Sequence, residues 1–74
     1  MSCRIDFMWD NEASVWIATS KDVPGLVLES GSFDALIERV RHAVPELLEL
    51  NSKPQTIVDL SFFSERHDQV AVYG

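Results

Sequence analysis

One amphipathic helix, in a chain whose other regular segments alternate as strands do, limits the folds open to this sequence. Its apolar side chains recur at spacings of three and four and form one stripe: Phe33, Leu36, Ile37, Val40, Val44, Leu47 and Leu48. The chain has 74 residues, and a domain of this size buries only about 60% of the surface that its unfolded form exposes. The stripe therefore needs a sheet to pack against, and we predict a single α+β domain over residues 1–74.

Segments that alternate apolar and polar residues, or that are rich in β-branched and aromatic residues, predict the strands of that sheet. The expected strands cover residues 3–9, 15–20, 26–29, 56–62 and 70–73. Short polar connections favour an antiparallel meander of the first three, and the helix makes the fourth strand parallel to the first because it acts as a crossover. The predicted order is β-β-β-α-β with a last β piece, and one helix covers one face of the sheet.

The second expected strand carries apolar residues on both of its faces. Val15, Ile17 and Thr19 form one face, and Trp16, Ala18 and Ser20 form the other. The pattern leaves open which face points toward the helix, and either choice leaves apolar groups on the side away from it.

The sequence of the expected helix has clear N-terminal signals and a proline in its interior. Ser32 is a suitable N-cap, and Asp34 places a negative charge in the first turn, where it suits the helix dipole. Pro45 lies within the stripe, and a proline inside a helix removes one backbone hydrogen bond at a cost of about 3 kcal/mol. We therefore expect a kink or a break near residues 43–44, with Asn51 capping the second piece.

Pro24 and Gly25 predict a corner between the second and third strands. Proline fixes φ near −65°, and glycine accepts the positive φ that a type II turn requires at its third position. We expect this structural corner to determine where the chain reverses and, with that, the register of the third strand.

The charge balance narrows the range of partners. The chain has 12 acidic residues against 6 basic ones, for a net charge of −6. Affinity for nucleic acid comes largely from Lys and Arg replacing counterions, so this balance disfavours nucleic acid and favours a basic or neutral partner.

Cysteine usage and hydropathy indicate the compartment. Cys3 is the only cysteine, which excludes an intrachain disulfide and a cysteine-based zinc site and is typical of a reducing cytosol. We expect it to act as a small buried apolar residue. No apolar run reaches the ~20 residues of a membrane span, and Arg4 and Asp6 interrupt the place where a signal peptide would be apolar. We predict a cytoplasmic protein without membrane contact.

The side chains that could carry catalysis do not form a recognisable site. Asp6, Asp59 and Glu38 could be imagined as a metal-dependent nuclease centre, but Glu38 lies on the helix, and the strand phases of the two aspartates direct them away from it. His42 and His67 have no third ligand at motif spacing. We therefore predict no enzyme activity, no metal and no cofactor.

Large aromatic side chains are the better candidates for a binding surface. Trp9 and Trp16 can pack in the core, but tryptophans also anchor protein interfaces. We take both, with Asp22 in the corner, as candidate interface residues. A thin core and the two apolar faces of residues 15–20 also predict a homodimer, formed through an exposed strand edge or the helix-free face of the sheet.

The corner and the helix start resemble a known superfamily. Residues 16–26 read W-x-A-x-S-x-D-V-P-G-L, and together with Ser32-Phe33-Asp34 and the helix end PELLELN they are similar to a bacterial family of small domains within the HicB-like antitoxins. The similarity covers about Ile5 to Asn51.

This resemblance implies a fold and a function. The fold would be a partial RNase H-like domain without nuclease residues, and the function would be to cover a small basic RNA-cleaving toxin of double-stranded-RNA-binding fold. HicB proteins usually carry a DNA-binding segment after this domain, for which we expect no room here. We therefore predict a non-catalytic module that binds a small basic protein. A stand-alone homo-oligomeric domain of other cellular role is the alternative, and the neighbouring gene would distinguish the two.

Overall fold

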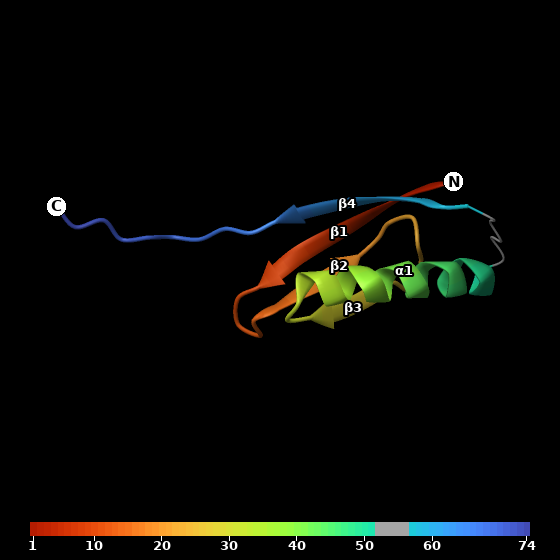
Figure 1. The fold of residues 1–74 in the computed structure, drawn as a ribbon, viewed down its shortest axis with the longest axis horizontal. Helices are drawn as coiled ribbons and strands as arrows, with labels where there is room; N and C mark the ends of the chain where they lie inside the picture. The colour runs from red at the N-terminus through yellow and green to blue at the C-terminus, as the bar shows by residue number, and fades with distance from the viewer. Residues whose placement is uncertain (52–56) are drawn as a thin grey trace.

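The computed structural model describes residues 1–51 and 57–74, and in them one helix packs on one face of a four-stranded mixed sheet (Figure 1). The elements are β1 (Ser2–Asp10), β2 (Val15–Thr19), β3 (Val27–Ser30), α1 (Phe33–Leu50) and β4 (Asp59–Glu65). The strand order is β3-β2-β1-β4, with β2 antiparallel to β1 and to β3, and β4 parallel to β1. The predicted α+β class, the three-stranded meander and the parallel fourth strand are confirmed.

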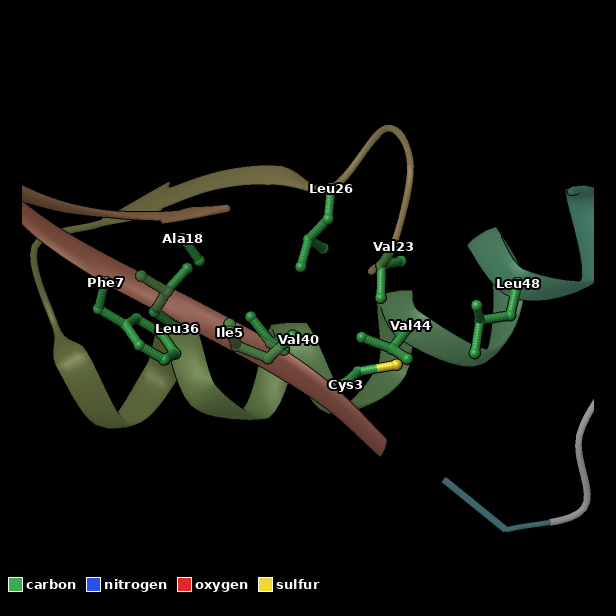
Figure 2. Packing of buried hydrophobic residues seen from close by; sticks show 10 residues of the cluster. All are labelled: Cys3, Ile5, Phe7, Ala18, Val23, Leu26, Leu36, Val40, Val44 and Leu48. Atoms are coloured by element: carbon green, nitrogen blue, oxygen red, sulfur yellow. The ribbon is translucent and has the colours of Figure 1, made fainter. Parts of the chain in front are cut away.

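The core lies between α1 and the sheet, as Figure 2 shows. The alternating residues Cys3, Ile5 and Phe7 of β1 point toward the helix and are buried, as their spacing predicts. The helical stripe meets them with four buried residues: Leu36, Val40, Val44 and Leu48. Ala18 is also buried, so the face of β2 that carries Trp16 and Ala18 is the one that points toward the helix.

Of the kink or break expected near residues 43–44, the break is wrong, because α1 continues through Pro45 without interruption. Pro45 is exposed, while Val44 before it and Leu48 after it are both buried in the core. Packing on both sides of the proline therefore offsets the lost hydrogen bond. Ser32 caps the beginning, as predicted, and its Oγ accepts from the Ala35 N–H at 3.2 Å. Asn51 caps the whole helix instead of a second piece.

The last expected strand is also wrong, since residues 70–73 form no strand in the described chain. These residues have the composition of a strand but lie beside no other strand to which they could hydrogen-bond. The fourth strand begins at Asp59 instead of residue 56, which lies outside the described residues, and it continues to Glu65.

Candidate protein-interaction surface

The corner after β2 has the predicted turn. The Leu26 N–H donates to the Val23 carbonyl at 3.2 Å, and Gly25 has a φ of 87°. Pro24 and Gly25 therefore occupy the second and third positions of a type II turn. Val23 and Leu26, on either side of them, are buried in the core. The corner thus connects two strands and also covers one end of the helix–sheet interface.

Asp22 lies in this corner as a hydrogen-bonding residue. Its Oδ2 accepts from the Arg4 N–H at 2.7 Å, and the Ser20 hydroxyl donates to the Arg4 carbonyl at 2.6 Å. The Asp22 N–H in turn donates to the Ser20 Oγ at 3.1 Å. The last backbone pair between β1 and β2 joins Asp6 and Thr19. Beyond it, the Ser20 and Asp22 side chains provide hydrogen-bond partners for the backbone groups of Arg4. This role of Asp22 was not predicted from the sequence. The pattern that could have indicated it is a hydroxyl residue and a carboxylate residue, Ser20 and Asp22, placed two apart between the end of a strand and a Pro-Gly pair.

The two candidate tryptophans lie on the helix side of the sheet. Trp9 and Trp16 are register partners whose ring centroids are 5.4 Å apart, and Trp16 lies 5.0 Å from the Phe33 ring. Both are half-buried, and the Arg66 guanidinium lies 3.8 Å above the Trp9 ring. The structure brings the pair together as an aromatic cluster at one end of the core, with an arginine from the other edge of the sheet over it.

The opposite face of the sheet, which we call the open face, is not covered by the helix. The strand register places these side chains on it: Arg4, Asp6, Met8 and Asp10 from β1, Val15, Ile17 and Thr19 from β2, Val27 and Glu29 from β3, and Asp59, Ser61, Phe63 and Glu65 from β4. Acidic residues outnumber the single arginine of this set. The open face therefore carries most of the acidic character of the sheet.

Across the open face runs a row of four residues in register, Glu29, Ile17, Met8 and Glu65. Met8 is 66% exposed, and it lines a shallow depression of about 390 Å³ together with Ile17 and Thr19. An apolar pair thus lies at the centre of the row with a carboxylate at each end. This arrangement can bind an apolar side chain that is flanked by cationic groups.

Beside this row, the charges of Arg4 and Asp6, two residues apart on β1, are partly neutralised within the chain. The Arg4 guanidinium pairs with the Asp6 carboxylate at 2.8 Å and lies 3.9 Å from the centre of the Phe63 ring. Since Arg4 has these two partners, it is held beside Asp6 and not beside the carboxylates of the row, Glu29 and Glu65. Glu65 also contacts the His67 imidazole at 2.9 Å.

The candidate catalytic side chains are spread over the molecule. Asp6 and Asp59 lie on the open face in different register rows, while Glu38 is exposed on the helix at the other side of the sheet. In residues 1–51 and 57–74, no group of three or more His, Cys, Asp or Glu side chains could hold a metal ion.

A comparison with solved structures found a protein of similar fold. The chain is similar to the crystal structure of the hypothetical protein TTHA1013 from the extremely thermophilic bacterium Thermus thermophilus, with a TM-score of 0.81 and 35% identity, over 95% of this chain and 100% of that chain. A search of curated proteins found no match. No helix in the described part of the chain combines the length and the apolarity of a membrane span.

A family model matches the chain from residue 2 to residue 74. Its description assigns no function, and it makes no connection to the HicB-like antitoxins, so that resemblance stays a prediction. Since the match covers nearly the whole chain, the protein belongs to the family described as a domain of unknown function, DUF1902.

Proposed function

We propose that the chain is a non-catalytic protein-interaction module whose open face binds a small basic protein. The observation that carries this proposal is the row Glu29, Ile17, Met8 and Glu65, in which a methionine is exposed between two carboxylates. Methionine adapts its shape to different apolar partners because it is unbranched and polarizable. An exposed methionine within an acidic surround suits a partner that presents an apolar residue among lysines or arginines.

Charge and apolar contact have different roles in this proposal. The net charge of −6 raises the local concentration of a cationic partner and speeds its association, an effect that salt screens over about 8 Å at 0.15 M. Met8 and Ile17 lose water on binding and contribute most of the affinity. Trp16, on the helix side, is not at this centre, so Met8 takes the place of anchor.

The resemblance of residues 16–26 to the HicB-like antitoxins supports a partner of the same chemistry, a small basic toxin-like protein. The alternative, a stand-alone homo-oligomeric domain of other cellular role, is supported by an extended segment that follows β4. The two differ in whether a basic protein is bound in the cell.

The test begins with the full chain as bait in the native cell and mass spectrometry of what it retains. We expect one small protein of high isoelectric point, which is then purified and titrated. Met8→Asp should weaken this binding at least about tenfold, because it puts a third carboxylate at the apolar centre. Leu50→Asp is the matched control, since Leu50 is an apolar residue at the end of α1 that is also well exposed, at 81% against 66% for Met8. Retention of no basic protein, or equal binding by the two variants, would contradict the proposal.

A further inference from the structure

The sheet has two unlike edges, and β4 forms the longer one. β3 has 4 residues and β4 has 7. Beyond β4 no strand pairs with it in the described residues, so its outward backbone groups are available to another strand. Its two phenylalanines point to opposite faces, and Phe62 is 40% exposed and Phe63 46% exposed.

The helix covers the inner side of β4 only in part. In backbone proximity α1 lies nearest β2 and β3, and β4 lies beside β1. Leu60 of β4 packs against the core, whereas Phe62 stays 40% exposed. Phe62 shares its face with the buried Ile5, and its ring lies 5.6 Å from the Phe7 ring. The core therefore continues under β4, but this flank remains open to solvent.

Residues 66–74, which we call the arm, leave the body of the molecule as an extended chain (Figure 1). Val70, Val72 and Tyr73 are 83%, 91% and 92% exposed. Apart from contacts of Arg66 with the tryptophans and of His67 with Glu65, the arm's interactions in the described chain are limited to the Gln69 N–H, which donates to Asp68 Oδ1 at 2.8 Å. The arm thus has strand-forming residues and an extended backbone without a strand beside it.

We propose that two copies of this chain exchange their arms, each arm adding to the edge of the partner's β4 as an antiparallel strand. Because the same chain supplies both the arm and the edge, a two-fold axis satisfies both at once. Nine extended residues span about 30 Å, and the seven of β4 span about 23 Å, so the arm is long enough to run along nearly the whole edge. The two sheets then form one continuous sheet.

The register between the arm and the partner's β4 follows from which charged residues can pair and from which face each side chain points to. We assign Arg66 opposite the partner's Asp68, which forms an ion pair on each side of the axis. In that register Phe62 lies beside the partner's Val72 on the inner face, because residues opposite each other in a sheet share a face. The open flank at Phe62 is then covered by an apolar side chain that is otherwise almost fully exposed.

The arm exchange does not rest on the proposed function. It uses the edge and the inner side of β4, while Met8 and Ile17 stay accessible on the open face. The two proposals can therefore fail separately.

Light scattering on the full chain over a range of concentrations tests the exchange. We expect a dimer at micromolar concentration, and Val72→Asp should raise its dissociation constant at least about 100-fold, because each dimer loses two buried valines and gains two buried carboxylates. Val27→Asp is the matched control, an exposed valine on the opposite edge strand. Val72 touches little within its own chain, so circular dichroism should show the variant folded. A monomer at high concentration, or a Val72→Asp dimer of unchanged affinity, would overturn the proposal.

A disulfide test addresses the register in a Cys3→Ala background. Ser61→Cys with Tyr73→Cys places two cysteines opposite each other across the exchange, so mild oxidation should give a covalent dimer. Ser61→Cys with Ala71→Cys is two residues out of register and should react at most one tenth as fast. Equal rates for the two pairs would reject the assigned pairing.

Discussion

The segments that follow β2 and β4 differ in what they contact. After β2, residues 20–26 turn back at once, hydrogen-bonded through Ser20 and Asp22 to Arg4 and closed by the Val23–Leu26 turn. After β4, the arm leaves the sheet and is exposed along its length (Figure 1). Both segments carry apolar residues, but only the first buries them.

The difference shows what a short chain can determine by itself. The corner contains its own turn residues, its own acceptors and donors, and two side chains that reach the core of the same chain. The arm contains β-forming side chains, but a strand needs hydrogen bonds from a neighbour, and its own sheet already ends at β4. A conformation is determined locally where its partners are close in sequence or already placed in the fold.

The largest expected effect compares two phenylalanines on the helix side of the sheet whose rings lie 5.6 Å apart, Phe7 buried in the core and Phe62 on the half-open flank at β4. Phe7 is 1% exposed, and Phe7→Ala should lower the free energy of unfolding by about 3–5 kcal/mol, since it leaves a cavity in the core. Phe62→Ala should cost about 1–2 kcal/mol, because Phe62 already contacts water. Urea unfolding of both variants at submicromolar concentration measures the difference.

If the two variants lose equal stability in that experiment, the flank at β4 is covered within one chain, and the contrast between the two phenylalanines is wrong. Ser61→Ala serves as the control for β4, because Ser61 is exposed on the open face and should change stability by less than about 0.5 kcal/mol.

The next effect concerns the backbone of the corner. Gly25→Val should cost about 2 kcal/mol, because Gly25 has a φ of 87°, which a β-branched residue resists. Space is not the cause, since a Cβ at this position would lie 3.5 Å from Leu47 Cδ2, an ordinary contact. Pro24→Ala should cost only about 0.5–1 kcal/mol, through added entropy of the unfolded chain. Thermal unfolding of both variants checks the order, and a smaller loss for Gly25→Val would contradict it.

Much of this fold could be predicted from residue patterns. The buried faces of β1 and α1 follow from spacings of two and of three to four, and the corner follows from Pro24-Gly25, because these signals depend on residues close together in the chain. The face of β2 could not be predicted, since both of its sides are apolar. In the structure Ala18 is buried in the core and Trp16 packs against it, so that face points toward the helix.

The errors have a common physical source, which is packing between distant residues. A break at Pro45 was expected from a local hydrogen bond, but Val44 and Leu48 stay buried around it. The strand at residues 70–73 was expected from composition, which says nothing about an available neighbour. The row through Met8 was missed as a candidate site because it joins β3, β2, β1 and β4, and only the register brings its members together.

The last expected effect, about as small as that of Pro24→Ala, tests whether the corner is held by side chains as well as by its turn. Asp22→Ala removes the acceptor of the Arg4 N–H, a bond of 2.7 Å to a charged group, and should lower the free energy of unfolding by about 1 kcal/mol. The site is exposed, so water can replace the carboxylate and keeps the loss small. Lys21→Ala, one residue away and also exposed, is the control and should stay within about 0.5 kcal/mol of the wild type.

Hydrogen exchange gives the residue-specific measurement: the Arg4 amide should exchange faster in Asp22→Ala, while the Leu26 amide, which donates to the Val23 carbonyl, keeps its protection. If both amides lose protection together, the corner opens as one unit and Asp22 holds the turn itself; if neither does, its contact with Arg4 contributes nothing to the fold.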